Sequence, residues 1–197
     1  KILHVIENLD NSYGGPAKSV PLLVKYLDKL NITNKIFTVQ VYTNESNTVL
    51  YSNNIDVTKV PIKGLSKIKY SPYLKDKIIA EITHDTIIHV HTVWTYPTYV
   101  AYKIAQEYNL PLLVSVRGTM YGWALNQSKY IKKFAMWLFQ KKMLKNADII
   151  HVTEIGEIKA LNDIGIENDF RLIPNGIELD NKFDSLSKNI LDTISYD

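Results

Sequence analysis

Two adjacent glycines, Gly14 and Gly15, follow the first apolar run of the sequence and precede Pro16. Glycine adopts positive φ without steric cost and allows a ligand to approach the backbone closely. Free N–H groups at the start of a following helix suit an anion or a hydroxyl. The segment lacks the G-x-G-x-x-G spacing of dinucleotide-binding proteins. It therefore indicates either a substrate-binding loop or a plain tight turn.

His89 and His91 are separated by one residue, and Trp94 follows them. Residues two apart in a strand point to the same side, so the two imidazoles are expected to share one face. A metal-binding pair is conceivable, but we find no nearby carboxylate or third histidine to complete it, and we predict no metal. We expect His89 to be a hydrogen-bonded structural residue, and His91, at the end of the strand beside Trp94, to be functional.

Arg117 and Gly118 follow another apolar run and precede two aromatic residues, Tyr121 and Trp123. The planar guanidinium of arginine matches a phosphate or a carboxylate, but it cannot act as a base. Flat aromatic faces suit sugar rings. The alternative is a structural arginine in a loop filled by aromatic side chains. Glu154 is the nearest carboxylate to a strand end, where it is either a substrate contact or a charge favoured by a helix N-terminus.

Short apolar runs alternate with stretches of helical spacing along the chain, and this alternation is typical of strands and helices in turn. We expect strands at residues 2–6, 36–42, 57–61, 87–91, 112–116, 148–152 and 170–173, and helices at 17–30, 71–82, 96–108, 129–146 and 154–162. The pattern predicts an α/β, Rossmann-like open parallel sheet with helices on both faces. Ligands of such sheets bind beyond the carboxyl ends of the strands, where the segments described above fall.

The composition limits the classes of protein. The 197 residues suit one domain with a core of its own. The absence of cysteine excludes disulfides and cysteine zinc sites, and it is compatible with an intracellular location. A net charge of +3 is too small to indicate nucleic-acid binding. Three lysines on one face of the helix expected at 129–146 suggest either contact with an anionic membrane or a solvated basic face.

Six short motifs, taken in order, resemble the N-terminal half of the family 4 retaining glycosyltransferases, which have the GT-B fold. The motifs are Gly14-Gly15-Pro16-Ala17 with Ser19-Val20; His89-Val90-His91 with Trp94; Arg117-Gly118-Thr119-Met120 with Trp123-Ala124-Leu125; Asp148 with Thr153-Glu154 and Glu157; Gly165; and Ile173-Pro174-Asn175-Gly176-Ile177-Glu178. Each motif is weak alone, but their order and spacing extend over nearly the whole chain.

The resemblance implies an N-terminal acceptor-binding domain at residues 1–173. Residues 174–197 would then be a linker and the start of a C-terminal donor-binding domain that this sequence lacks. The parent enzyme would be a transferase of the hexosyl type acting in polysaccharide biosynthesis. It would move a sugar from a nucleotide-sugar to a saccharide or lipid-linked acceptor with retention, without a bound metal or other cofactor, and this chain alone would be inactive. We expect a cytoplasmic protein, with peripheral contact on the inner membrane face as an option.

The same resemblance assigns residues to roles. His91 and Arg117 are predicted as catalytic, and the predicted substrate-binding residues are Gly14, Gly15, Trp94, Gly118, Tyr121, Trp123 and Glu154. Many relatives carry histidine where Arg117 stands, so the role of that histidine does not transfer to it. The alternatives are a non-catalytic module that binds a glycan or a partner, a GT-B epimerase, and, least favoured, an NAD enzyme.

Overall fold

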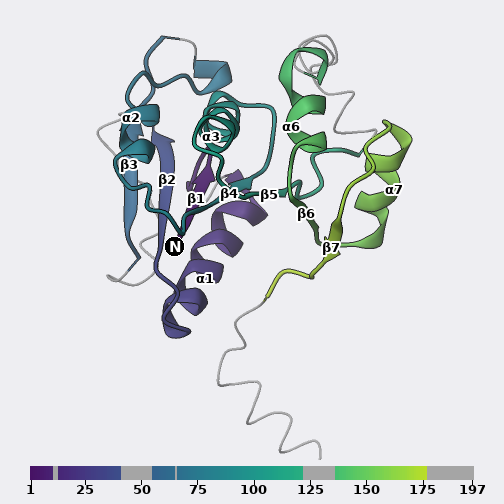
Figure 1. The fold of residues 1–197 in the computed structure, drawn as a ribbon, viewed down its shortest axis with the longest axis horizontal. Coiled ribbons are helices and arrows are strands. Elements are labelled where there is room, and N and C mark those ends of the chain that lie inside the picture. The colour runs from purple at the N-terminus through teal and green to yellow at the C-terminus, as the bar shows by residue number, and fades with distance from the viewer. Residues whose placement is uncertain (11–12, 41–54, 65, 122–135, 177–197) are drawn as a thin grey trace, which may run out of the picture.

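The computed structural model describes residues 1–10, 13–40, 55–64, 66–121 and 136–176. Within them the chain forms one sheet in the order β3-β2-β1-β4-β5-β6-β7, and every neighbouring pair is parallel. The strands are β1 (Ile2–Ile6), β2 (Asn34–Gln40), β3 (Val57–Pro61), β4 (Ile87–His91), β5 (Leu112–Ser115), β6 (Ile149–Val152) and β7 (Phe170–Leu172) (Figure 1). The predicted α/β open parallel sheet is confirmed.

The helices are α1 (Gly15–Lys29), α2 (Leu74–Ile79), α3 (Tyr96–Glu107), α6 (Lys141–Lys145) and α7 (Ile155–Asp163). A short 3-10 turn spans Ser66–Ile68, and a π-helical turn, Met136–Gln140, leads directly into α6. Proline at the start of α1 and of α3 suits a position whose N–H has no partner within the helix. No described helix is long and apolar enough to cross a bilayer.

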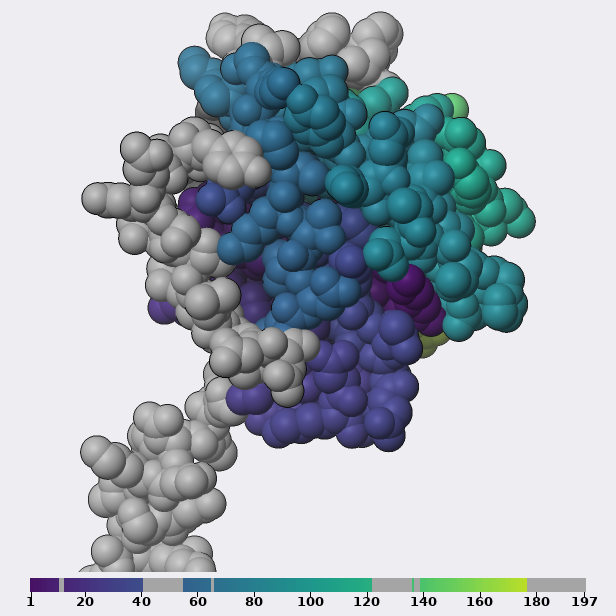
Figure 2. Space-filling view, turned by 90° about the vertical axis from the view of Figure 1, so that its left-hand side faces the viewer, coloured from purple at the N-terminus to yellow at the C-terminus, as the bar shows by residue number. Residues whose placement is uncertain are grey.

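Alternating side chains in each strand point to opposite faces of the sheet. One face packs against α2, α3, α6 and α7 and forms the main core, with Leu3 and Val5 of β1 and Val90 of β4 fully buried. On the other face, Ile6 and Ile36 pack with Val20 and Val24 of α1 in a smaller cluster. Figure 1 shows α1 on the opposite side of the sheet from α3 and α6. Figure 2, viewed from the side of β3 and α2, shows the α1 segment below these two elements.

Two predicted helices differ from the structure at their ends. The helix expected to begin at Ser71 and Pro72 begins instead at Leu74, because Ser71 is buried and Tyr73 occupies the N-cap position. It also ends early, at Ile79. Of the helix expected at 129–146, residues 129–135 lie outside the described residues, and 136–140 are π-helical.

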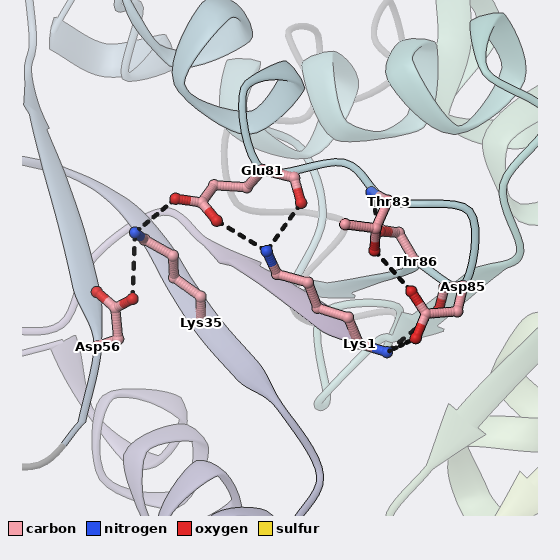
Figure 3. Close-up of polar contacts among 7 residues, drawn as sticks. All are labelled: Lys1, Lys35, Asp56, Glu81, Thr83, Asp85 and Thr86. Carbon is pink, nitrogen blue, oxygen red and sulfur yellow. Dashed lines mark hydrogen bonds and ion pairs between the residues drawn. The ribbon is translucent and has the colours of Figure 1, made fainter.

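A network of ion pairs closes the amino edge of the sheet (Figure 3). The carboxylate of Glu81, just after α2, lies 2.8 Å from Nζ of Lys1 and 2.9 Å from Nζ of Lys35. Lys35 also pairs with Asp56 at 3.1 Å, and the N-terminal amine pairs with Asp85 at 3.3 Å. Hydrogen bonds from the two lysines lower the pKa of Glu81 to about 2. The network therefore joins β1, β2 and the residue before β3 to the chain that follows α2.

Candidate functional site

Arg117 joins three elements at the carboxyl edge of the sheet. Its Nη1 donates to Oγ of Ser19, in α1, at 2.8 Å and to Oδ1 of Asn175, after β7, at 2.7 Å. Its Nη2 faces Nδ1 of His91, at the end of β4, at 3.4 Å. Parallel strands end at the same edge, which is why residues so distant in sequence meet here.

The backbone around Arg117 is unusual and is held by a buried carboxylate. Arg117 has φ 48° and Gly118 has φ 74°, both in the left-handed region. The N–H of Gly118 donates to Oε1 of Glu157, and the N–H of Thr153 donates to Oε2 at 2.6 Å. Glu157 is only 1% exposed, so it fixes the loop after β5 to the start of α7.

Arg117 keeps its positive charge in this setting. Burial lowers its pKa to about 10, and the carboxylate of Glu157 acts in the opposite direction. A pKa of about 10 leaves the guanidinium protonated at neutral pH. Its Nε is buried and has no hydrogen-bond partner among the described residues. Arg117 thus gives the carboxyl edge an oriented, partly desolvated cation.

Three histidines lie side by side beneath Arg117. The sequence led us to expect no third histidine beside His89 and His91, and this expectation was wrong. His4 of β1 is in register with His89 of β4, and its Nδ1 lies 3.0 Å from Nε2 of His91. All three side chains are buried, at 0%, 4% and 0% exposed for His4, His89 and His91. His91 is therefore a residue under the site rather than on its surface.

The contact with Arg117 sets the proton positions of two imidazoles. A guanidinium only donates, so Nδ1 of His91 must accept, and the proton of a neutral His91 lies on Nε2. That Nε2–H donates to Nδ1 of His4, which leaves the proton of His4 on its own Nε2. Nε2 of His4 is buried without a partner among the described residues. The pKa of His4 is lowered to about 3 by burial and by the charge of Arg117.

A second hydrogen-bonded chain runs beside the first. His151 of β6 donates from Nε2 to the carbonyl of Ile173 at 2.7 Å, so its Nδ1 accepts from the hydroxyl of Ser115 at 2.8 Å. Oγ of Ser115 in turn accepts from Nε2 of His89 at 2.8 Å. Burial lowers the pKa of His89 and of His91 well below the usual value. The residues after β7 are thereby connected to the interior of the sheet.

The three imidazoles bring one nitrogen each to within 4.8 Å of one another, which raises the question of a metal ion. A histidine that binds a metal normally donates its other N–H to a carboxylate or a carbonyl. Here the other nitrogen of His91 faces Arg117, a donor that carries positive charge. The chemistry of the surroundings therefore suits neutral, hydrogen-bonded imidazoles and opposes a bound cation.

The loop after β4 is strained and contacts the loop after β5. Thr92 and Trp94 have φ of 64° and 86°, values that residues other than glycine rarely adopt. Nε1 of Trp94 donates to the carbonyl of Thr119 at 3.3 Å, and its backbone N–H donates to the side chain of Gln140 at 3.1 Å. Strain of this kind persists where the surroundings enforce it, often at functional sites.

Tyr121 and Glu154 form a pair farther along the same edge. The hydroxyl of Tyr121 donates to Oε1 of Glu154 at 2.6 Å, and partial burial together with this hydrogen bond raises the pKa of Tyr121 to about 12. Gly156 is required beneath the ring, since a Cβ there would lie 2.7 Å from the tyrosine oxygen. Trp123, also predicted as a substrate contact, lies outside the described residues.

Gly14 and Gly15 are exposed at the start of α1. Gly14 has φ 92°, a conformation that favours glycine, and no heavy atom would lie within 4 Å of a Cβ at either position. The space beside both residues is open to a ligand. Farther along α1, a cavity of about 250 Å³ lies between this helix and residues 173–176, with Ser19, Arg117 and His151 in its lining.

Sequence reasoning singled out Arg117 and His91 but did not assign the residues that contact them or hold their loop. Ser19, Glu157 and Asn175 stood in the motifs without a role, whereas the motifs did not include His4, Ser115 and His151. A signal existed for His4 and His151, because each is a single polar residue within an apolar strand. No local pattern predicts that Ser19 contacts Arg117, since the two residues are 98 positions apart in the sequence.

Comparison with known proteins places this geometry in context. The family model described as Glycosyltransferase Family 4 matches residues 13–181. A search of the curated proteins finds no significant match. Among solved structures, sucrose-phosphate synthase from Thermosynechococcus elongatus is similar with a TM-score of 0.56 and 16% identity, covering 99% of this chain and 100% of that chain.

HepE from Anabaena, solved in complex with UDP-glucose, is similar with a TM-score of 0.60 and 14% identity. A second HepE structure, with UDP and glucose, gives a TM-score of 0.60 and 12% identity. The match covers 96% of this chain but 49% of each HepE chain, so this chain spans about half of that protein. These structures share the fold, and the family match extends over most of the sequence: the chain belongs to Glycosyltransferase Family 4.

Proposed function

We propose that residues 1–173 form the acceptor-binding domain of a glycosyltransferase, and that residues 174–197 lead into a donor-binding domain. The observation that carries this proposal is the position of Arg117, a half-buried cation held at the carboxyl edge by Ser19 and Asn175 in a chain of this family. The match to half of HepE supports the division into two domains.

In this proposal Arg117 stabilises negative charge during transfer. The sugar leaves a nucleotide diphosphate, and fixed positive groups aimed at the leaving group lower the barrier. The backbone of Gly14 and Gly15 approaches the same diphosphate across the cleft between the domains. Trp94, Gly118, Tyr121 and Glu154 line the acceptor side. His91 acts through Arg117, because it is buried and its Nδ1 faces the guanidinium.

We further propose a nucleotide-sugar of the hexosyl type as donor, retention at the anomeric carbon, and a saccharide or lipid-linked acceptor. The binding of UDP-glucose by HepE supports a nucleotide-sugar. Retention rests on the resemblance to retaining enzymes described above. Peripheral membrane contact through the helix expected at 129–146 stays a prediction, and Lys129, Lys132 and Lys133 lie outside the described residues.

The test uses a polypeptide that contains both domains, incubated with nucleotide-sugars and candidate acceptors while nucleotide release is followed. Replacing Arg117 by alanine should lower kcat/KM by about 10²–10³, in the range found for loss of one charge-stabilising donor. Arg171→Ala is the matched control, since Arg171 is exposed on β7 and pairs only with Asp169 among the described residues. Equal turnover of the Arg117→Ala and parent proteins would remove Arg117 from the site.

The same assay separates transferase from binding module. A transferase domain should give no nucleotide release as the 197-residue chain alone and sustained release when both domains are present. A non-catalytic module would bind a glycan in both forms, measured by calorimetry, and would release nucleotide in neither.

A further inference from the structure

A basic segment follows β3 at the carboxyl edge of the sheet. Residues 62–73 contain three lysines and no acidic residue, whereas the chain as a whole has 23 basic and 20 acidic side chains. The lysines are Lys63, Lys67 and Lys69. None of them forms an ion pair with another described residue, while Lys75, farther along, pairs with Glu107 at 3.0 Å. Residues 62–73 therefore carry positive charge that the described residues do not neutralise.

Aromatic side chains lie beside these lysines and continue toward the candidate site. Nζ of Lys63 lies 5.0 Å from the centre of the Tyr73 ring. The ring of Tyr70 packs edge-on against that of Tyr96, with 4.8 Å between the ring centres. Tyr96 is the first residue of α3 and comes two residues after Trp94, which belongs to the candidate site. The three tyrosines therefore link the basic segment to the loop after β4.

The side chains of this region are open to solvent. Tyr70 is 36% exposed and Tyr73 is 41% exposed, and Lys63 and Lys67 are also exposed. Figure 2 shows the segment from β3 to α2, in blue, at the surface turned toward the viewer. Flat aromatic faces suit sugar rings, and lysine ammonium groups bind carboxylates and phosphates as point charges. Together these side chains suit a saccharide that carries negative charge.

We propose that these lysines and tyrosines bind an anionic saccharide, namely the part of the acceptor that lies beyond the sugar to which transfer occurs. The binding residues, called the Lys-Tyr surface, are Lys63, Lys67, Lys69, Tyr70 and Tyr73. The identity of the ligand rests on the proposed function, because the acceptor is expected at this edge of the sheet. The Lys-Tyr surface then adds affinity and selects an acceptor that carries negative charge.

The side chains of this surface favour a saccharide over a lipid bilayer. Segments that lie in a membrane interface present large apolar side chains such as tryptophan, phenylalanine and leucine. Among the described residues of 62–73, Ile68 is the only exposed large aliphatic side chain, and the exposed aromatic side chains are both tyrosines. A tyrosine hydroxyl donates and accepts hydrogen bonds, which suits the hydroxyls of a saccharide and disfavours hydrocarbon.

Calorimetry on the 197-residue chain tests this proposal with saccharide probes that differ in charge. Tetragalacturonate carries one carboxylate per ring, and reduction of its carboxyl groups gives a neutral counterpart of the same length. Tetragalacturonate should bind at least about tenfold more tightly than the neutral tetrasaccharide, and its affinity should fall as salt is added, because salt screens exposed charges. A phosphorylated mannose oligosaccharide, as a third probe, shows whether phosphate replaces carboxylate as the anionic group.

Two lysine variants locate the binding. Lys67→Gln combined with Lys69→Gln should weaken the binding of the anionic probe at least about fivefold, since it removes two charges from the Lys-Tyr surface. Lys25→Gln combined with Lys29→Gln is the matched control, because it removes the same charge from α1, on the other side of the sheet. This control should change the affinity by less than about twofold, since exposed charges beyond a Debye length are largely screened.

A tyrosine variant measures the aromatic contribution. Tyr73→Ala should weaken the binding of the anionic probe at least about threefold, since it removes a flat face from the Lys-Tyr surface. Tyr108→Ala is the matched control, because Tyr108 is also 41% exposed but follows the last residue of α3, at the far end of that helix from Tyr96. The control should leave the affinity of the parent chain unchanged.

Equal affinity for tetragalacturonate and its neutral counterpart overturns the proposal, as does equal binding by the parent and the variant at Lys67 and Lys69. Failure of both anionic probes to bind also overturns it, and attachment to phosphatidylglycerol vesicles in that case would indicate a membrane surface instead. None of these measurements depends on nucleotide release. A two-domain protein that transfers sugar to neutral acceptors, while neither anionic probe binds, keeps the proposed function and loses the Lys-Tyr surface alone.

Discussion

The two faces of one sheet meet opposite surroundings. On the side of α2, α3, α6 and α7, the strands present aliphatic side chains that are buried in a single core. On the side of α1, the same strands present His4, His89, His91, Ser115 and His151, linked by hydrogen bonds that end at Arg117 and Ile173. The first face contributes stability, and the second holds a cation and the residues after β7 in place.

The difference follows from what each face must do. Aliphatic packing is tolerant of shape, whereas hydrogen bonds fix direction, because each donor needs an acceptor at a defined angle. A row of neutral imidazoles positions Arg117 without adding a second charge beside it. As a consequence, two buried nitrogen atoms form no hydrogen bond within the described residues: Nε2 of His4 and Nε of Arg117.

The largest expected difference in stability is between alanine variants of Leu112 and Leu113, two leucines in one strand that face opposite sides of the sheet. Leu112→Ala should lower the free energy of unfolding by about 2–5 kcal/mol, because it empties a fully buried site. Leu113→Ala, at a partly exposed position, should cost no more than about 1.5 kcal/mol. Urea denaturation of both variants measures the difference, and equal losses would contradict the inequality of the two faces.

Sequence patterns predicted the apolar face well for a physical reason. Runs such as Leu112 to Val114 are strand-like whatever the rest of the fold does, and alternation with helices then fixes a parallel sheet. The other face was predicted poorly. Whether His4 meets His89 depends on which strands are neighbours and in what register, and this is a property of the whole sheet.

The second expected effect is a dependence of folding stability on acidic pH, which arises from the histidines on the α1 side of the sheet. The pKa of His4 is about 3 in the folded chain, against about 6.5 when unfolded, so the unfolded state binds more protons as the pH falls below 6.5. The contribution of neutral His4 to the free energy of unfolding is fully present above pH 6.5 and should fall by about 1.4 kcal/mol per pH unit below it.

His4→Leu tests this dependence. The variant should lose less stability between pH 6.5 and 5 than the parent, by about 1–2 kcal/mol, measured by urea denaturation at each pH. His84→Leu is the control, since His84 is exposed in the turn before β4. A slope identical in the parent and in His4→Leu would show that His4 is not held neutral by burial.

The third expected effect concerns the hydrogen bonds that the guanidinium of Arg117 donates. Arg117→Lys keeps the charge but cannot contact Ser19, Asn175 and His91 together, so the free energy of unfolding should fall by about 1–2 kcal/mol. Arg171→Lys, at an exposed position, should change it by less than about 0.5 kcal/mol. Hydrogen exchange near Ile173 should also accelerate in Arg117→Lys only. Unchanged exchange would mean that Arg117 does not hold the residues after β7.

The candidate site was also predictable only in part, because its contacts depend on how distant segments come together in the fold. The position of Arg117 at the carboxyl edge was predicted, because it directly follows an apolar strand and ligands of such sheets bind at that edge. Its partners Ser19 and Asn175 are ordinary residues of a helix and of the segment after β7, and only the folded arrangement brings them together. Glu157 was visible as part of a motif, but its role in binding the N–H of Gly118 depends on the left-handed turn at residues 117–118.

The smallest expected effect on stability concerns the amino edge of the sheet, which is held by ion pairs rather than by neutral imidazoles. Glu81→Gln should lower the free energy of unfolding at pH 7 by about 0.5–1 kcal/mol, because the two ion pairs with Lys1 and Lys35 are partly exposed. The folded pKa of Glu81, about 2, lies below its ordinary value of 4.5, so this contribution is present above pH 4.5 and is lost as the pH falls toward 2. His4 responds between pH 6.5 and about 3, so the two networks begin to fail at different pH values. Parent and Glu81→Gln should therefore differ above pH 4.5 and converge near pH 2, and a difference that persists at pH 2 would show that Glu81 stabilises the chain by packing rather than by charge.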